Sequence, residues 1–454
     1  MMKYQAYEEY KDSGVEWLGD IPEHWQLTRI KYIAELTPKK PNIQRNLQCS
    51  FVPMEKLKIN SIVLDEERLI EDVYDGYTYF QDEDILMAKV TPCFENKNIA
   101  VAKELINQIG FGSSEIYVIR VNNKALNRYL YYRLQEGSFM DIATAAMTGA
   151  GGLKRVPSDV VNNFIMAFPV VGEQQKIANF LDHETTKIDT LIEKQQQLIK
   201  LLKEKRQAVI SHAVTKGLNP SAPMRDSGVE WLGEVPEHWI VRRAKFLFDF
   251  VTSGSRGWAD YYSDDGALFF RIANLTRDTI EPKLESIQRV NPPLGGEGVR
   301  AKIKNDDLLI SITADLGSVC VANIDIVDGY VSQHVSLCRP SREVVSSRWL
   351  GYCILSDSVK DQLLGSGYGG TKIQLSLEDI RELWLVQPSS DEQTEIADFI
   401  DAKLMRFSSL MQLANQQIEL LQERRTALIS AAVTGKIDVR NWHAPNKANK
   451  EAIV

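Results

Sequence analysis

Three short segments of the chain have residue types that could support catalysis. Residues 291–294 read NPPL and resemble the N-P-P-aromatic motif of amino-methyltransferases, but the fourth residue is leucine and no glycine-rich strand-to-helix turn precedes them. Residues 365–370 read GSGYGG, yet they do not open a long helix after a strand, as a dinucleotide loop does. Glu95 and Lys97 have nuclease-like E-x-K spacing with Asp84 upstream, a pattern short enough to arise by chance. The sequence therefore predicts no catalytic site in this chain.

The histidines and cysteines do not predict a metal site either. The chain has six histidines, and none of them has metal-ligand spacing. Its five cysteines are scattered, odd in number and never arranged as C-x-x-C, which disfavours both a disulfide framework and structural zinc. We expect no metal, no disulfide and a reducing cytoplasmic location.

The length and composition are those of a multidomain globular protein. The chain has 454 residues, of which 44% are apolar and 25% charged, and at roughly 150 residues per domain this suggests about three units. No apolar stretch reaches the roughly 18 residues of a membrane span, and the N-terminus lacks an apolar signal region. The net charge of −8 disfavours general binding to polyanions. Any nucleic-acid binding must therefore rest on local basic surfaces or on basic partners.

The chain contains an internal repeat. Residues 11–25 (KDSGVEWLGDIPEHW) return as residues 225–239 (RDSGVEWLGEVPEHW), and we call these two segments the caps. Downstream, EQQKIANFLD at 173–182 returns as EQTEIADFID at 392–401, and KRQAVISHAVTKG at 205–217 returns as RRTALISAAVTGK at 424–436. The layout is thus a cap, a middle and a helix, written twice and joined by the proline-containing linker at 217–223.

The two middles, about 26–172 and 240–391, differ except at a few anchor segments. DEDILMAKVTP (82–92) parallels NDDLLISITAD (305–315), and GFGSSEIYVIR (110–120) parallels GYVSQHVSLCR (329–339). TGAGGLKRVPSD (148–159) parallels GSGYGGTKIQLS (365–376). Equal frames around unequal middles indicate one scaffold that presents two recognition units of different preference. The alternative is a tandem duplication whose middles drifted freely.

Two glycine-free and proline-free segments with heptad apolar spacing predict two long helices. One stripe contains Leu181, Ile188, Leu202 and Val209, a second contains Ile177, Leu191 and Leu198, and the other helix repeats both. A helix of about 40 residues spans roughly 60 Å. We expect the helices to pair with each other, antiparallel rather than parallel, through Ile188, Leu191, Leu198, Leu202, Phe407, Leu410, Leu421 and Leu428. Their basic ends are either a solvated face or a contact to a partner or a phosphate.

On these segments the chain resembles the specificity (S) subunit of type I restriction–modification enzymes, the HsdS family. The resemblance extends over nearly the whole chain and rests on long segments: both caps, both EQ-x-x-IA-x-F-[LI]-D helix starts, both IS-x-AVT helix ends, DILMAKVTPCFENKNIAVA (84–102), GFGSSE (110–115), SGSRGWADYYSDDGALFFRIANLTRD (253–278) and DLLISITADLGSV (307–319).

The resemblance implies an α+β fold with two target-recognition domains of mixed α/β structure, separated by two long antiparallel helices. The implied segments are a first recognition domain, a spacer helix, a linker, a second recognition domain, a second helix and a tail, at 1–172, 173–216, 217–224, 225–391, 392–436 and 437–454. It also implies that each domain reads half of a split, asymmetric site in double-stranded DNA.

The resemblance further implies partners and their cofactors. The helices are expected to dock two methyltransferase (M) subunits, which carry S-adenosylmethionine and modify adenine. Motor-nuclease (R) subunits are expected to use ATP and Mg²⁺, while this chain binds no cofactor of its own. Two dissimilar readers on a near-symmetric frame predict a non-palindromic target, since symmetric dimers give palindromes.

Candidate DNA contacts follow from residue type and from position beside the anchor segments. Arginine and lysine suit guanine edges or phosphates, and asparagine and glutamine suit adenine. The glycine-rich turns at 149–152 and 367–370 allow backbone amides to approach a phosphate. The candidates are Lys89, Thr91, Lys97, Lys154 and Arg155 in the first middle, and Arg256, Arg271, Asn274, Lys372 and Gln374 in the second.

Two other hypotheses compete with a DNA-reading subunit. A coiled-coil scaffold that binds only proteins would give no salt-dependent, sequence-specific DNA affinity in the assembled complex. A self-sufficient methyltransferase would bind its cofactor as an isolated chain, and the missing motifs argue against it.

Overall fold

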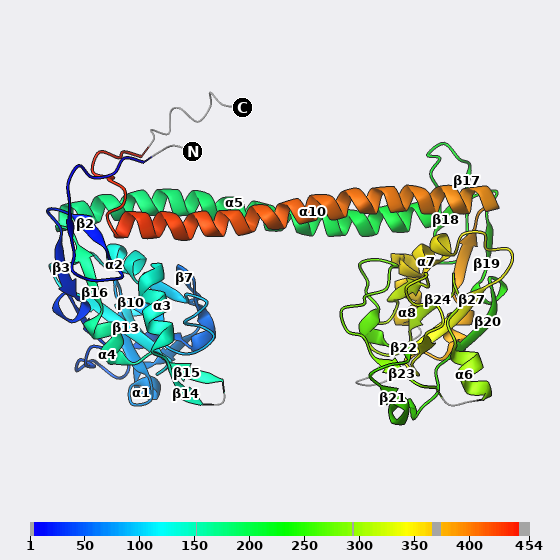
Figure 1. Ribbon diagram of the computed structural model, residues 1–454, viewed down its shortest axis with the longest axis horizontal. Coiled ribbons are helices and arrows are strands. Elements are labelled where there is room, and N and C mark those ends of the chain that lie inside the picture. The colour runs from blue at the N-terminus through cyan, green and yellow to red at the C-terminus, as the bar shows by residue number, and fades with distance from the viewer. Residues whose placement is uncertain (1–3, 151, 293–294, 366–373, 445–454) are drawn as a thin grey trace. The chain divides into compact units, whose positions relative to one another are not determined.

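The computed structural model describes residues 4–150, 152–292, 295–365 and 374–444. The chain forms two compact units, unit 1 from residues 1–195 and 416–454, and unit 2 from residues 196–415. Each unit contains one cap, one middle and one half of each long helix (Figure 1). None of the helices in the described ranges is long and apolar enough to cross a membrane.

Unit 1 contains two four-stranded sheets. The first has the order β11-β10-β13-β4, all antiparallel, and the second has the order β8-β5-β12-β9, in which β12 and β5 are parallel. The strands of these sheets are β4 (Ala34–Leu36), β5 (Gln48–Val52), β8 (Glu67–Leu69), β9 (Thr78–Gln81), β10 (Ile85–Ala88), β11 (Ile99–Val101), β12 (Ile109–Gly112) and β13 (Ile116–Val121). The small pairs are β1 (Tyr10–Asp12) with β2 (Asp20–Pro22), β3 (Gln26–Arg29) with β16 (Ile165–Phe168), β6 (Leu57–Lys58) with β7 (Ser61–Ile62), and β14 (Thr148–Ala150) with β15 (Leu153–Arg155). The short helices are α1 (Ile70–Val73), α2 (Asn127–Arg133), α3 (Gly137–Ala145) and α4 (Ser158–Asn163).

Unit 2 repeats the first sheet with the order β20-β27-β24-β25, and its second sheet again contains a parallel pair, β22 with β26. Its strands are β17 (Met224–Asp226), β18 (Glu234–Pro236), β19 (Ile240–Arg243), β20 (Phe248–Ser253), β21 (Tyr262–Ser263), β22 (Ala267–Phe270), β23 (Arg289–Val290), β24 (Leu308–Ser311), β25 (Val319–Val321), β26 (Tyr330–Val331), β27 (Val335–Pro340) and β28 (Trp384–Gln387). Its short helices are α6 (Gly296–Ala301), α7 (Ser347–Leu355), α8 (Asp357–Gly365) and α9 (Leu377–Arg381). The predicted mixed α/β class is confirmed.

The same kind of buried ion pair occurs in the first sheet of both units. Asp84 precedes the fully buried strand β10, and its carboxylate accepts hydrogen bonds from Arg120 of β13 at 2.8 and 2.6 Å. Asp307 precedes β24 and accepts from Arg339 of β27 at 2.8 Å on both oxygens. Both aspartate side chains are at most 2% exposed. In both units an acidic residue before one strand is neutralised by an arginine on the neighbouring strand. This ion pair is therefore a feature that the anchor segments of the two units share.

Each middle is closed at its base by pairing of its first and last strands. β3 pairs antiparallel with β16, from Gln26 opposite Phe168 to Arg29 opposite Ile165. β19 pairs in the same way with β28 in unit 2. Each middle is therefore an insertion whose two ends lie side by side where it meets the cap and the long helix.

The two long helices are α5 (Val171–Lys216), with 46 residues, and α10 (Ser390–Val433), with 44. They begin two residues earlier than the predicted 173 and 392. In unit 1 the first half of α5 runs antiparallel to the last part of α10, and Arg425 donates to Asp189 at 2.9 Å. In unit 2 the last part of α5 and the first half of α10 share one apolar core. Each pairing is consistent with the predicted coiled coil.

The structure differs from the prediction in one of the two apolar stripes. Ile188, Leu202, Phe407 and Leu428 are buried and Leu421 is partly buried, all of them in the two cores. By contrast, Leu191, Leu198 and Leu410 are 46, 42 and 47% exposed and face outward. The second stripe runs one residue further along each helix, through positions such as Thr185, Ile192, Leu404, Met411 and Ile418. Both choices keep 3–4 heptad spacing, so the period alone did not separate them.

Two adjacent leucines test this assignment. Leu202 is 8% exposed in the core of unit 2, whereas Leu201 is 60% exposed. We expect Leu202→Ala to lower the free energy of unfolding by about 2–4 kcal/mol through the cavity it leaves, and Leu201→Ala by less than about 0.5 kcal/mol. Urea unfolding of the two variants measures the difference, and equal losses would contradict the assigned seam.

Each cap is fastened to the start of a long helix by one glutamate. In unit 1 the buried Glu173 accepts from Trp25 Nε1 at 3.0 Å and from Tyr7 at 2.7 Å, and lies 2.9 Å from His24 Nε2. In unit 2 Glu392 accepts from Trp239 Nε1 at 3.2 Å and lies 3.0 Å from His238 Nε2. The histidine and tryptophan of each PEHW segment thus anchor the helix start.

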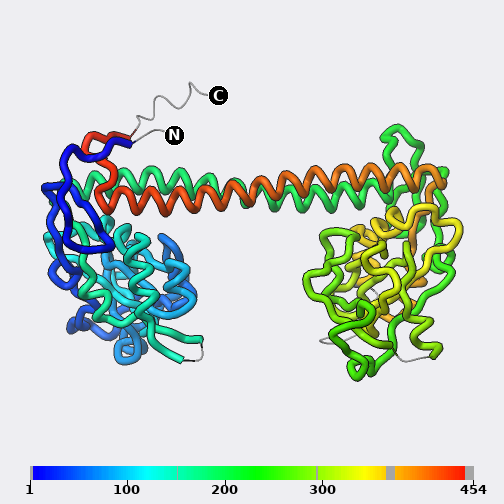
Figure 2. Tube along the Cα trace, in the orientation of Figure 1, coloured from blue at the N-terminus to red at the C-terminus, as the bar shows by residue number. Residues whose placement is uncertain are grey.

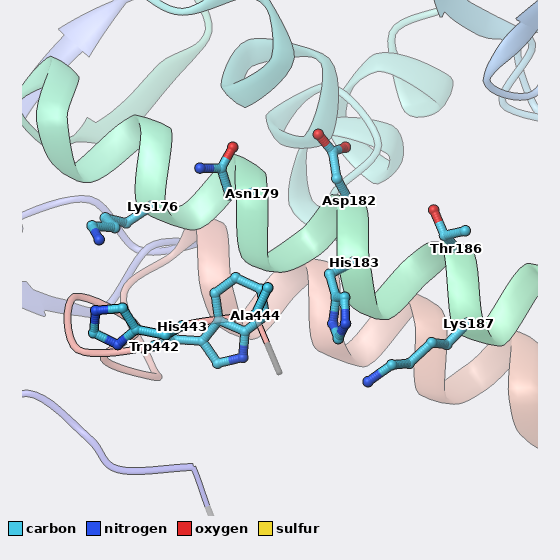
Figure 3. Close-up of a pocket in the computed structure, with 9 residues that line it drawn as sticks. All are labelled: Lys176, Asn179, Asp182, His183, Thr186, Lys187, Trp442, His443 and Ala444. Carbon is cyan, nitrogen blue, oxygen red and sulfur yellow. The ribbon is translucent and has the colours of Figure 1, made fainter. Parts of the chain in front are cut away.

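The described part of the C-terminal segment lies beside the N-terminal segment that precedes the first cap (Figure 2). The Asp438 amide donates to the Gln5 carbonyl at 2.7 Å, and the Trp442 ring lies 5.4 Å from that of Phe180 on α5. Figure 3 shows Trp442 and His443 beside the side of α5 that carries Lys176 and His183, where they border a shallow hollow of about 800 Å³. The segment that follows α10 therefore returns to the N-terminal segment and to the start of α5.

Candidate nucleic-acid interface

Three anchor segments of unit 1 meet at one edge. The Lys89 amide, just after β10, donates to the Glu115 carbonyl at 3.0 Å, and the Val156 amide donates to the Lys89 carbonyl at 2.9 Å. The Thr91 amide donates to the Lys154 carbonyl at 3.1 Å. These bonds join the end of β10, the turn at 113–115 and the β14–β15 hairpin. In Figure 1 the hairpin lies on the side of unit 1 away from α5.

This edge brings together four of the five candidates in the first middle. Lys154 is exposed, and Lys89 Nζ lies 5.3 Å from the centre of the Tyr117 ring. Arg155 donates to both carboxylate oxygens of Glu115, at 2.9 and 2.8 Å, and stays 46% exposed. These hydrogen bonds hold the pKa of Glu115 below its usual value. The edge therefore presents lysine charge beside an arginine whose geometry is fixed by a carboxylate.

Two of the first candidates have other roles in the fold. The Thr91 hydroxyl donates to the Gly152 carbonyl at 2.8 Å and accepts from the Lys154 amide at 3.0 Å, so it holds the hairpin in place. Lys97 follows the reversal after β10 and lies among Glu136, Asp141 and Arg425. Burial, together with the charge of Arg425, lowers the pKa of Lys97. Lys97 is therefore separate from the edge.

Unit 2 builds the corresponding edge with the same backbone bonds. The Ile312 amide donates to the His334 carbonyl at 3.2 Å, and the Leu375 amide donates to the Ile312 carbonyl at 2.8 Å. Gln374 is exposed at this edge. Lys372 and the whole glycine-rich turn at 367–370 lie outside the described residues. The same backbone framework thus has Ile312, His334 and Gln374 in unit 2. At the corresponding positions unit 1 has Lys89, Glu115 and the β14–β15 hairpin.

A recess of about 290 Å³ distinguishes the edge of unit 2. Trp258 and Phe269 line it with their rings 5.9 Å apart and 25° from parallel, and Tyr262 lies at its side. Four buried polar atoms of its lining residues have no hydrogen-bond partner among the described residues: Trp258 Nε1, Arg271 Nε, Ser332 Oγ and Gln333 Oε1. Buried polar atoms are usually paired, so these four atoms around the recess are exceptions to the usual pattern.

The remaining candidates of the second middle are placed differently. Arg256 is exposed in the loop before Trp258, and Arg271 lines the recess with its Nη2 3.3 Å from Ser286 Oγ. Asn274 is fully buried: its amide donates to two carbonyl oxygens at 2.9 Å and accepts from the Arg271 amide at 2.9 Å. Asn274 therefore stabilises the loop from inside, and its side chain is not free to contact a base.

Sequence reasoning missed Glu115, Trp258 and the segment 332–334 as parts of these edges. Their segments were recognised as anchors, but a carboxylate among basic residues does not suggest DNA contact by its type.

No group of three or more metal-ligating side chains occurs in the described parts of the chain. Burial raises the pKa of the Cys49 thiol to about 11, which leaves it protonated at neutral pH.

The comparison with known proteins identifies the family. The model for "Type I restriction modification DNA specificity domain" matches residues 22–201 and 298–420, together more than half of the chain. The specificity subunit of the type I restriction enzyme EcoAI from Escherichia coli is 36% identical over 161 residues, which are 35% of this chain and 27% of that subunit. The matched region of this chain therefore spans about a quarter of the length of that curated relative.

Two further comparisons extend over nearly the whole chain. The specificity subunit of MjaVIII from Methanocaldococcus jannaschii is 20% identical over 430 residues, 93% of this chain and 95% of that subunit. A solved structure, described as the structural basis of complex assembly and conformational transition of the type I R-M system, shares the fold with a TM-score of 0.72 at 18% identity, over 92% of this chain and 99% of that chain. The repeated frame, the paired edges and these matches agree that the chain belongs to the family of type I restriction–modification DNA specificity domains.

Proposed function

We propose that this chain is the DNA-reading subunit of a type I restriction–modification complex and carries no catalytic site of its own. Each edge reads one half of a bipartite, asymmetric target in double-stranded DNA. The observation that carries this proposal is that one backbone framework is built twice with different side chains on its edge. Two different edges on equivalent frames favour two different half-sites.

The proposal includes the other members of the complex. The exposed sides of α5 and α10 dock two methyltransferase subunits, which hold S-adenosylmethionine and methylate adenine. Motor-nuclease subunits, driven by ATP and Mg²⁺, carry out restriction. Leu191, Leu198, Leu201 and Leu410 support this docking, since they are outward-facing leucines on helices that are already paired.

Genome-wide mapping of methylated adenine, with and without this chain, tests the proposal. We expect a two-part, non-palindromic motif that vanishes when the gene is deleted and returns on complementation. An unchanged methylation pattern would exclude the role. Partner binding without any sequence-specific, salt-dependent DNA affinity in the assembled complex would favour a protein-only coiled-coil scaffold instead.

Lys154 supplies a narrower prediction about unit 1. It is exposed on the β14–β15 hairpin and forms no ion pair with the described residues. Lys154→Ala should weaken DNA binding by the complex roughly threefold and lower the slope of log K against log salt by about one, as expected for one lost phosphate contact. Lys124→Ala, an exposed lysine near the start of α5, is the control and should leave both values unchanged. A salt titration in which the two variants behave alike would exclude the hairpin contact.

A further inference from the structure

Most of the residues shared by the two caps have a structural task. Asp12 and Asp226 each accept a hydrogen bond from a glycine amide two residues on, at 2.9 and 3.0 Å. The serines that follow close the same turn, Leu18 and Leu232 are buried, and the glycines of both turns have positive φ. The PEHW segments anchor the helices as described above. The fold alone thus explains most of the repetition.

Trp17 and Trp231 are exceptions. They occupy the same position in the two caps and are 46 and 44% exposed. Neither ring makes a hydrogen bond or a ring contact with the described part of the chain, whereas Trp25 and Trp239, eight residues on, are at most 2% exposed. The turn does not need an indole at its surface, yet both repeats have one. Exposed tryptophans are frequent energetic centres of protein interfaces.

The charge around these tryptophans indicates the kind of partner. Each cap has four acidic residues and one basic residue, a net charge of −3 with histidine neutral. Glu16 and Glu230 directly precede the tryptophans and are exposed without a hydrogen bond to the described residues. Such a surface repels DNA phosphates. It complements a protein surface that has an apolar pocket with a basic rim.

We propose that Trp17 and Trp231 are matching docking anchors, each for one copy of the methyltransferase subunit. The surface occurs twice with the same residues while the middles differ, so it fits the partner that is present twice rather than the asymmetric DNA. This inference rests on the proposed function and adds a second docking surface to that of the helices. The indole enters an apolar pocket of the partner, and the acidic residues face its basic rim.

Assembly stoichiometry tests the proposal. Purified methyltransferase subunit is titrated against the full chain and followed by native mass spectrometry. We expect Trp17→Ala to weaken one of the two sites at least tenfold and leave the other unchanged. Trp231→Ala should do the same to the other site, and the double variant should weaken both. Glu16→Lys should also weaken one site, with a loss that shrinks at high salt.

Several controls separate docking from folding and from DNA reading. Trp17→Phe keeps a ring and should retain most of the affinity, and Ile59→Ala removes a 51% exposed side chain elsewhere in unit 1 and should change nothing. The proposal would be overturned by unchanged affinity in both tryptophan variants, or by equal weakening of both sites in a single variant. It would also be overturned if the variants lost self-association or motor-subunit binding instead of methyltransferase binding. With saturating methyltransferase, the Trp17→Ala complex should still select the wild-type target. If even the wild-type complex shows no sequence-specific DNA binding, the proposed function is wrong. The measured number of bound methyltransferase subunits still tests whether the two tryptophans are docking anchors.

Discussion

Replacing residues 26–169 with the corresponding segment of a relative will change one half of the DNA target and leave the other half unchanged. The segment begins with β3 and ends with β16. Because these two strands pair with each other, the exchanged segment includes the whole strand pair that closes the middle. The Asp84–Arg120 pair and the β14–β15 hairpin lie inside it as well. Because each wrong base pair costs about 1–3 kcal/mol, the chimaera should lose its original half-site almost completely.

Mapping of methylated adenine in cells that carry the chimaera measures this result. The exchanged segment must still meet Gln174 of α5, whose side chain bonds the Leu126 amide and the Lys124 carbonyl, so a donor with a compatible segment there is preferred. The reciprocal exchange of residues 240–387, bounded by β19 and β28, is the matched control and should change only the other half-site. A change in both halves, or in neither, would refute two independent readers.

The frame could be predicted from the sequence because the repeats preserve the residues that build it. The anchor segments begin beside Asp84 or Asp307 and end with Arg120 or Arg339, and these residues form the two buried ion pairs. An acidic turn before an apolar strand is a local signal. Its arginine partner lies on a different strand, so the pairing itself became visible only in three dimensions.

The helix seam and the contact residues could be predicted only in part. Both apolar stripes satisfy a 3.5-residue period, and outward-facing leucines such as Leu191 and Leu198 favoured the wrong one. At the edges, residue type does not reveal whether a polar group is already satisfied. Thr91 bonds the hairpin backbone and Asn274 bonds its own loop, so neither side chain is free as sequence position suggested.

Removing the buried carboxylate of either unit will destabilise that unit more than any surface change. Asp84→Ala leaves Arg120, whose side chain is 27% exposed, without its partner, and Asp307→Ala does the same to Arg339. An orphaned buried charge costs about 3–5 kcal/mol, and the partial exposure of the arginines places the expected loss near 3 kcal/mol. Urea unfolding gives the size of the loss. Hydrogen exchange should show faster opening of β10 and β13 in the first variant and of β24 and β27 in the second.

Two further variants show whether the loss comes from the unpaired charge. Asp84→Leu combined with Arg120→Leu removes both charges, and it should recover most of the stability because no charged group then lacks a partner. Asp75→Ala removes an exposed carboxylate of unit 1 and should cost less than about 0.5 kcal/mol. If the double variant were as unstable as Asp84→Ala, the loss would come from packing around the strand or from the lost hydrogen bond between the Gln81 amide and Asp84, rather than from the unpaired charge. If Asp84→Ala matched Asp75→Ala, the ion pair would not hold the sheet, and the shared anchor segments would need another explanation.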